Sequence, residues 1–218
     1  MRYSCVVFDL DGTLLNTLDD LASSTNYALA AHGLPLRTTD EVRQFVGNGI
    51  RNLIRRAVPE GSSEELVEEV HATFDRHYAS HSMVQTGPYP GIPQLLSRLH
   101  KAGIRCCVVS NKGDYAVRPL VEHFFPGAFD RACGERERDG IRRKPWPDTV
   151  LTCLDAVGAT PHNSVYVGDS EVDLLTAKNA RMPCIIVSWG FRDAHELRKQ
   201  GARVVVDTAQ ELYTAILE

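Results

Sequence analysis

The sequence predicts an α/β fold in which a parallel sheet is covered by helices on both faces and an all-helical segment is inserted near the start. Two observations carry this prediction. From about residue 92 onward, short apolar runs that suit buried strands alternate with amphipathic helical patterns. Between residues 17 and 81, in contrast, apolar residues recur only at helical spacing and no strand-like run occurs.

The first part of the chain holds one predicted strand followed by a helical block. The apolar run over residues 4–9 predicts a buried strand that ends in polar residues. Apolar residues at three- and four-residue intervals then predict a series of helices, with glycine and proline at their ends. These helices cover about residues 18–32, 39–46, 50–58 and 63–81.

Two linkers mark where the helical block joins the rest of the chain. One lies near residues 15–17, and the other, rich in glycine and proline, covers residues 85–90. We therefore expect a core domain formed by residues 1–15 and 86–218, and a helical cap domain formed by residues 16–85.

The second half of the chain alternates helices and strands. Continuous apolar runs, such as residues 106–109 and 204–206, suit strands that are buried on both faces of a parallel sheet. The predicted strands cover residues 104–110, 164–168, 184–188 and 203–206. The predicted helices cover residues 92–99, 114–124, 148–157, 171–179, 194–200 and a terminal segment from residue 208.

Composition narrows the possible partners and location of the protein. The chain has 218 residues, a hydrophobic content of 43% and a net charge of -4, without the basic patch expected of a nucleic-acid-binding protein. No apolar run is long enough for a membrane span. The chain enters a strand without a leader, and its six cysteines form no C-x-x-C pair. We expect a cytoplasmic monomer or homodimer with no nucleic-acid or membrane partner.

The most informative stretch is Val6-Val7-Phe8-Asp9-Leu10-Asp11-Gly12-Thr13-Leu14. Asp9 and Asp11 follow a buried strand at spacing i, i+2, so both carboxylates start out facing the same side. Placing two like charges together is costly unless a cation lies between them or one stays protonated. The pair therefore predicts metal binding, acid–base chemistry or both, whereas the ordinary alternative is an Asp-Gly turn.

Three later stretches complete a pattern that suits a phosphate ester. Ser110 ends the run Val108-Val109, Lys144 precedes Pro145, and Asp169 follows a strand with Asp173 four residues on. Ligands of open parallel sheets bind at the carboxyl ends of the strands. Taken singly, these residues could be a strand end, a surface lysine and helix caps. Together, in this order, they favour a site with carboxylates, a hydroxyl and a cation.

These motifs resemble those of the haloacid dehalogenase superfamily of phosphotransferases. The matching residues are Asp9-Leu10-Asp11-Gly12-Thr13, Ser110, Lys144 before Pro145, and Gly168-Asp169 with Asp173. Within the superfamily the chain is most similar to the phosphoglycolate phosphatase group, through Leu14-Leu15-Asn16-Thr17, Val46-Gly47-Asn48-Gly49-Ile50 and Pro90-Gly91-Ile92. The resemblance implies a Rossmann-like core with a helical cap. One departure is Arg181, which stands where the family often has a glycine.

The resemblance also implies catalytic roles. Asp9 would be the nucleophile that forms an aspartyl-phosphate, and Asp11 would be the general acid and base. The resemblance places Mg²⁺ on the carboxylates of Asp9 and Asp169 and on the backbone carbonyl of Asp11. Asp173 would orient water or Lys144.

Substrate contacts are expected from both domains. In the core, Ser110, Lys144 and the backbone near Asn111 would bind phosphate oxygens, and Thr13 would either assist or stabilise its turn. In the cap, the glycine-flanked segment with Asn48 and Arg51 could bind a small carboxylate. The alternative for Arg51 is a helix start on the cap surface.

The predicted function is Mg²⁺-dependent hydrolysis of a small phosphorylated metabolite, with 2-phosphoglycolate as the first candidate. A sugar-phosphate mutase would use the same carboxylates, but family mutases often have valine where this chain has Thr13. A phosphatase for pyrophosphate or nucleotides is a further alternative. A non-catalytic binding protein is the alternative from another class, against which the complete set of charged residues argues.

Overall fold

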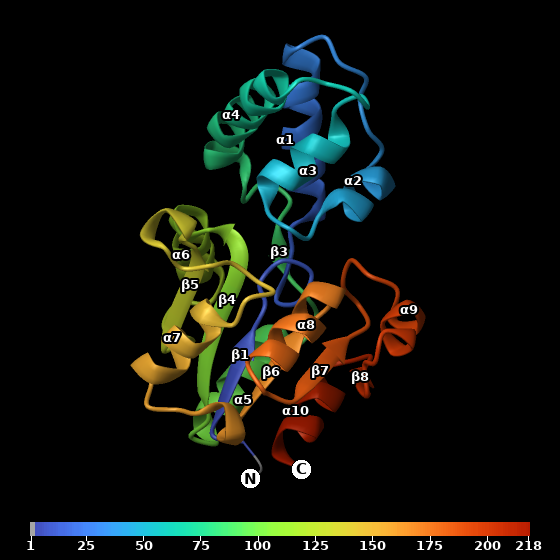
Figure 1. Cartoon of the computed structure of the whole chain (residues 1–218). Helices are drawn as coiled ribbons and strands as arrows, with labels where there is room; N and C mark the ends of the chain where they lie inside the picture. Colours follow the sequence, from blue (N-terminus) through green and yellow to red (C-terminus); the bar gives the residue numbers. More distant parts are fainter. Residues whose placement is uncertain (1–2) are drawn as a thin grey trace. The chain divides into compact units, whose positions relative to one another are not determined.

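The computed structural model describes residues 3–218, which form two compact units (Figure 1). The core domain combines the chain up to Leu15 with Pro88–Glu218, and the cap domain is Asn16–Gly87. The second boundary lies two residues later than the sequence predicted. The buried carboxylate of Asp20 explains the difference, because it accepts hydrogen bonds from the N–H groups of Val84, Gln85 and Thr86 at 2.9–3.1 Å and so ties this segment to the cap.

The core is built on a six-stranded parallel sheet with strand order β5-β4-β1-β6-β7-β8. The strands are β1 (Cys5–Phe8), β4 (Arg105–Gly113), β5 (Arg131–Glu135), β6 (Ser164–Gly168), β7 (Cys184–Val187) and β8 (Val204–Val206). From the central β1, the chain adds β4 and β5 on one side and then β6, β7 and β8 on the other. The order reverses at β1, which is the position where open parallel sheets bind ligands.

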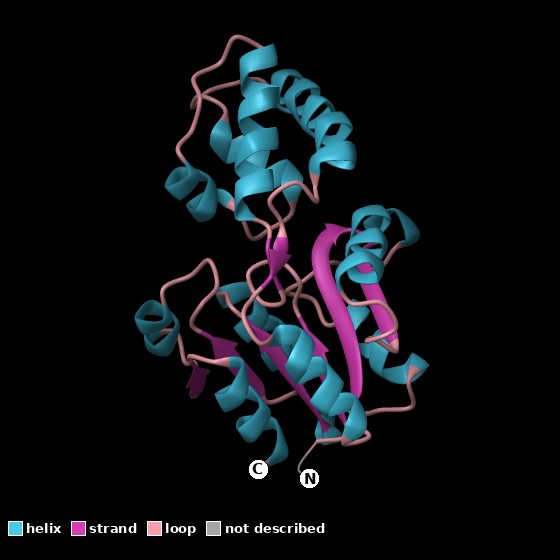
Figure 2. Ribbon diagram, turned by 180° about the vertical axis from the view of Figure 1, so that it is seen from behind, coloured by secondary structure: helices cyan, strands magenta, loops and turns pink. Residues whose placement is uncertain are grey.

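Helices cover both faces of this sheet (Figure 2), and successive strand residues alternate between them. Val6 and Phe8 pack with the helices of one face, and Cys5 and Val7 pack with those of the other. The first face carries α5 (Ile92–Lys101), α6 (Asp114–Phe124) and α10 (Ala209–Leu217). The second carries α7 (Asp148–Ala156), α8 (Glu171–Asn179) and α9 (Ala194–Lys199). The predicted α/β fold is thus confirmed.

The cap consists of four helices with their own buried side chains. They are α1 (Leu18–Ala31), α2 (Thr39–Phe45), α3 (Ile50–Ala57) and α4 (Glu64–His81). Val70, Phe74 and Tyr78 follow one face of α4 at four-residue intervals and are buried. The linkers form a two-stranded sheet from β2 (Leu15–Asn16) and β3 (Gly87–Pro88). Within residues 3–218, no helix combines the length and apolar character that crossing a bilayer requires.

Three local features differ from the sequence prediction or add to it. Strand β5 was not predicted, because its segment has charged ends, a glycine and no apolar run, and it becomes a strand by pairing with β4 at the sheet edge. Strand β4 runs past Ser110 to Gly113, with a register shift that accommodates the polar residues. Arg181 has a φ of 57°, in the left-handed region that favours glycine.

Candidate active site

The candidate active site lies at the carboxyl ends of the three central strands. Phe8 of β1 pairs with Val108 of β4 and Val167 of β6, so the residues that follow these strands emerge side by side. Asp9 leaves β1 with its N–H bonded to the Val167 carbonyl at 2.9 Å. The sheet therefore places the carboxylates after β1 and β6 and the polar end of β4 at one edge.

Lys144 joins two of the buried carboxylates. Its ammonium lies 2.8 Å from Asp9 Oδ1 and 2.8 Å from Asp173 Oδ1, and only 4% of its side chain is exposed. The hydroxyl of Tyr166 donates to the same Asp173 oxygen at 3.1 Å. Burial by itself would lower the pKa of Lys144, but the charges of Asp173 and Asp9 outweigh it and raise that pKa. Lys144 is therefore a fixed cation in the site.

Asp169 is held by a hydroxyl, a backbone amide and two close glycines. Thr13 Oγ1 donates to Oδ1 at 3.1 Å, and the N–H of Phe191 donates to Oδ2 at 2.7 Å. A Cβ on Gly12 would lie 2.3 Å from Asp169 Oδ2, and one on Gly190 would lie 2.2 Å from its Cβ. Side chains larger than glycine do not fit there. Burial, and then the charge of Asp173, raise the pKa of Asp169 to about 7.

Asp173 is a supporting carboxylate whose oxygens are both occupied. Beside the Lys144 and Tyr166 contacts on Oδ1, Oδ2 accepts from the N–H of Asp169 at 3.2 Å, and from Ser170 through its N–H at 3.1 Å and its hydroxyl at 2.6 Å. Asp173 lies in the first turn of α8, so its backbone places it against the ends of β1 and β6. These contacts direct Oδ1 of Asp173 toward Lys144 and Tyr166.

Together these groups leave the site short of positive charge. One carboxylate oxygen from each of Asp9, Asp169 and Asp173 lies within 4.8 Å of the others, and all three residues are buried. Burial, followed by the charge of Asp173, raises the pKa of Asp9 well above its ordinary value. If all three carboxyl groups are ionised, Lys144 offsets one of their charges. A divalent cation with hard oxygen ligands would balance the rest, so the donor set fits such an ion.

Asp11 is held separately, by the end of β4. Ser110 Oγ donates to Asp11 Oδ2 at 3.3 Å, and the Lys112 ammonium lies 3.0 Å from Oδ1. The next residue, Asn111, is buried and donates from its side-chain amide to the Lys144 carbonyl at 3.1 Å. The end of β4 thus contacts both the second aspartate and the segment that carries Lys144.

The two predicted cap residues belong to the other domain and have local partners there. The guanidinium of Arg51 lies 2.7 Å from Glu64 and also binds Glu68, both on α4. The carbonyl of Asn48 accepts a hydrogen bond from Asn52 at 2.8 Å. The predicted core residues, in contrast, are linked by the contacts described above. Thr13 is among them, with its hydroxyl directed to Asp169.

Sequence reasoning assigned no role to three groups that shape the site. Lys112 stands two residues after Ser110, and the predicted strand end at Ser110 places it in a loop, whereas β4 continues to Gly113. Tyr166 lies within the apolar run of β6, and no sequence pattern distinguishes a tyrosine whose buried hydroxyl contacts the site from one that only packs in the core. Phe191, whose N–H donates to Asp169, lies just after β7. Only the adjacent Trp189-Gly190 pair indicates this segment in the sequence.

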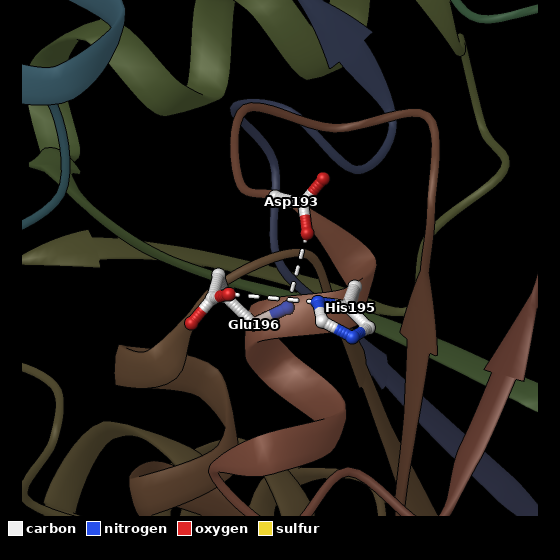
Figure 3. A group of neighbouring side chains, drawn as sticks. All are labelled: Asp193, His195 and Glu196. Atoms are coloured by element: carbon white, nitrogen blue, oxygen red, sulfur yellow. Dashed lines mark hydrogen bonds and ion pairs between the residues drawn. The ribbon is translucent and has the colours of Figure 1, made fainter.

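A second group of potential ligands lies at α9 (Figure 3) and has a simpler explanation. Asp193, His195 and Glu196 are exposed. Asp193 caps the helix by accepting the N–H of Glu196 at 3.0 Å, and Glu196 binds Lys199 at 2.8 Å. These contacts are those of an ordinary helix start.

Comparisons with known sequences place the chain among hydrolases. A family model described as haloacid dehalogenase-like hydrolase matches residues 6–187. The phosphoglycolate phosphatase of Agrobacterium fabrum is 35% identical over 221 residues, covering 97% of this chain and 91% of that protein. Phosphoglycolate phosphatase 1 of Pseudomonas aeruginosa is 32% identical over 213 residues, covering 95% of this chain and 77% of that protein.

Solved structures are similar over nearly the whole chain. One structure comes from Lactobacillus delbrueckii subsp. bulgaricus, and its assignment as a phosphoglycolate phosphatase is an inference. It is 40% identical with a TM-score of 0.93, covering 99% of both chains. CbbY from Rhodobacter sphaeroides, solved in complex with phosphate, is 24% identical with a TM-score of 0.78, covers 96% of each chain and supports the fold alone. By its family match and sequence identities, the chain belongs to the haloacid dehalogenase-like hydrolase family.

Proposed function

We propose that the protein is a Mg²⁺-dependent phosphatase that hydrolyses a small phosphate monoester, with 2-phosphoglycolate as the first candidate. The observation that carries this proposal is the buried group of Asp9, Asp169 and Asp173, in which three carboxylates face one lysine. A site with this charge is stable and useful when a cation completes it.

The residues that would hold Mg²⁺ are the side chains of Asp9 and Asp169 and the backbone carbonyl of Asp11. All are hard oxygen donors, which Mg²⁺ prefers. When bound, the ion would neutralise charge on the attacking carboxylate and on the phosphoryl oxygens. Thr13 and the N–H of Phe191 would keep Asp169 oriented for this task, since both donate to it.

The proposed reaction has two steps that use the carboxylates after β1. In the first, an oxygen of Asp9 attacks phosphorus, the ester P–O bond breaks, and Asp11 gives a proton to the departing alkoxide. In the second, Asp11 takes a proton from water, the water oxygen attacks the phosphorus of the aspartyl-phosphate, and Asp9 is released with inorganic phosphate.

Other core residues would stabilise the phosphoryl group during both steps. Lys144 lies 2.8 Å from Asp9, so its charge is available to the phosphate carried there. Asp173 would fix the direction of that ammonium. The hydroxyl of Ser110 and the backbone near Asn111, at the end of β4, would donate to phosphoryl oxygens.

The substrate is the finer part of the proposal. Support for 2-phosphoglycolate comes from relatives that bear the name phosphoglycolate phosphatase at 32% and 35% identity. Asn48 and Arg51 of the cap would help to select it only if Arg51 exchanged Glu64 or Glu68 for a substrate carboxylate. A loss of activity in Arg51→Ala that is confined to carboxylate-bearing esters would support that exchange.

The experiment that tests the proposal measures phosphate release from a panel of esters. The panel contains 2-phosphoglycolate, hexose phosphates, nucleotides and pyrophosphate, each with and without Mg²⁺, and Asp9→Asn is the control. Preference for 2-phosphoglycolate that requires both Mg²⁺ and Asp9 is the expected result. No release from any ester would contradict the enzyme assignment, and preference for another ester would correct the substrate.

A further inference from the structure

Lys112 is a buried lysine to which the proposed steps assign no task. It lies near the end of β4, and only 3% of its side chain is exposed. Lysine is almost never buried without an anionic partner. Here the partner is the carboxyl group of Asp11, whose Oδ1 lies 3.0 Å from the Lys112 ammonium. Lys112 therefore contacts the carboxyl group to which we assign proton transfer.

The end of β4 holds Asp11 through both carboxylate oxygens. Lys112 contacts Oδ1, while the Ser110 hydroxyl donates to Oδ2 at 3.3 Å. The backbone N–H of Lys112 also donates to that hydroxyl at 3.1 Å, so Lys112 supports both contacts. The side chain of Asp11 is 15% exposed, and these two polar contacts restrict its orientation.

Lys112 and Lys144 are both buried, and they contact different carboxylates. Lys144 lies against Asp9 and Asp173, whereas Lys112 lies against Asp11. Separate cations keep the two reacting carboxylates in separate places. This matters because a general acid works only within hydrogen-bonding reach of the departing oxygen, and a misplacement of about 1 Å costs on the order of 100-fold in rate.

We propose that Lys112 is a positioning residue that fixes the carboxylate of Asp11 at the departing ester oxygen. The inference rests on the proposed function, since it gives Lys112 a role only through Asp11. It separates Lys112 from Lys144, whose charge acts on the phosphoryl group itself.

The test compares two esters that differ in their need for an acid. The alkoxide of 2-phosphoglycolate needs a proton to depart, whereas the phenolate of 2,4-dinitrophenyl phosphate does not. The ratio kcat/KM reports only the steps up to the aspartyl-phosphate. Lys112→Met is expected to lower kcat/KM for 2-phosphoglycolate by about 10- to 100-fold, and for the dinitrophenyl ester by less than about threefold.

Asp11→Asn supplies the reference for this comparison. It is expected to show the same difference between esters, with a loss of about 100-fold or more on 2-phosphoglycolate. Adding Lys112→Met to Asp11→Asn is expected to cost nothing further, because Lys112 acts through Asp11. Lys112→Arg keeps the charge and should recover part of the rate. Lys101→Met, at an exposed lysine of α5, is the matched control.

Each outcome separates the inference from the function on which it rests. Equal losses on both esters in Lys112→Met, or a further loss in the double variant, would overturn the positioning role while the acid role of Asp11 stands. An Asp11→Asn enzyme that treats both esters alike would overturn the acid role and the inference with it. Melting temperatures establish that each variant is folded, and Lys112→Gln replaces Lys112→Met if the latter is not.

Discussion

Two charged clusters, one in each domain, use ion pairs of similar length in opposite surroundings. In the core, Lys144 pairs with Asp9 and Asp173 at 2.8 Å, and these side chains are at most 10% exposed. In the cap, Arg51 pairs with Glu64 at 2.7 Å, with exposures of 42% and 62%. The core cluster comprises Asp9, Asp169, Asp173 and Lys144, and the cap cluster comprises Arg51, Arg55, Glu64 and Glu68.

The difference indicates how a cluster that suits a bound cation can be distinguished from an ordinary surface ion-pair cluster. The cap cluster is balanced, two cations against two anions, and water screens it, so its pairs contribute little. The core cluster has three carboxyl groups against one cation and little contact with water. Such an imbalance is costly in a buried site and is relieved by a bound cation. Function is therefore expected where burial and imbalance coincide.

The largest effect is expected from removing Asp9, the proposed nucleophile. Asp9→Asn keeps the size of the side chain but takes away the attacking carboxylate, so phosphate release should fall by at least about 10⁴-fold. The same change removes a buried negative charge, so the metal-free variant should melt no lower than the metal-free parent. Phosphate release and thermal melting in a chelator measure the two effects. Retained turnover would contradict the assignment of Asp9.

The next effect sharpens the role of burial in the core cluster. Lys144→Met leaves Asp9 and Asp173 without their shared cation, and the free energy of unfolding should fall by about 3 kcal/mol in the metal-free protein. Urea denaturation measures this loss, with Lys101→Met, at an exposed lysine, as the matched control. Equal stability of the two variants would mean that the loss of a lysine from the core cluster costs no more free energy of unfolding than the loss of a surface lysine.

A smaller effect concerns pH. The pKa of Asp169 is raised from 3.8 to about 7, first by burial and then by Asp173. Between those values the folded protein binds a proton at Asp169 that the unfolded chain does not. The contribution of Asp169 to the free energy of unfolding is therefore fully present below about pH 4 and is lost as pH rises through about 7. Asp169→Asn should flatten this decline in the metal-free protein.

Urea midpoints at several pH values in a chelator measure that slope. The residual slope in the variant is expected from Asp9, whose pKa is also raised, first by burial. Added Mg²⁺ should stabilise the parent more than Asp169→Asn, because the variant lacks one proposed ligand. A slope that is unchanged by the substitution would show that Asp169 titrates elsewhere.

The smallest effect is expected in the cap. Arg51→Ala removes pairs that are exposed and screened, so the melting temperature should change little, and less still at high salt. Turnover of 2-phosphoglycolate should change by less than about fivefold. A larger loss, confined to esters that carry a carboxylate, would show that Arg51 leaves Glu64 and Glu68 for the substrate and would break the contrast between the two clusters.

Local sequence patterns sufficed to predict the strands and helices whose apolar residues form runs or recur at regular spacing. The valine-rich runs of β1 and β6 predicted where Asp9 and Asp169 emerge, and apolar spacing predicted the cap helices. What the patterns missed depends on contacts between distant residues. Strand β5 exists through pairing with β4, and the contact of Lys112 with Asp11 joins residues that only the sheet brings together.

The central claim is that Asp9 carries the phosphoryl group in a site completed by Mg²⁺. The most direct test quenches the enzyme in acid during turnover of 2-phosphoglycolate and locates any covalent phosphoryl group by peptide mass spectrometry. The account predicts an acid-stable adduct on the peptide that contains Asp9, dependent on Mg²⁺ and absent from Asp9→Asn. An adduct on another residue, or one that forms equally without Mg²⁺, would contradict it.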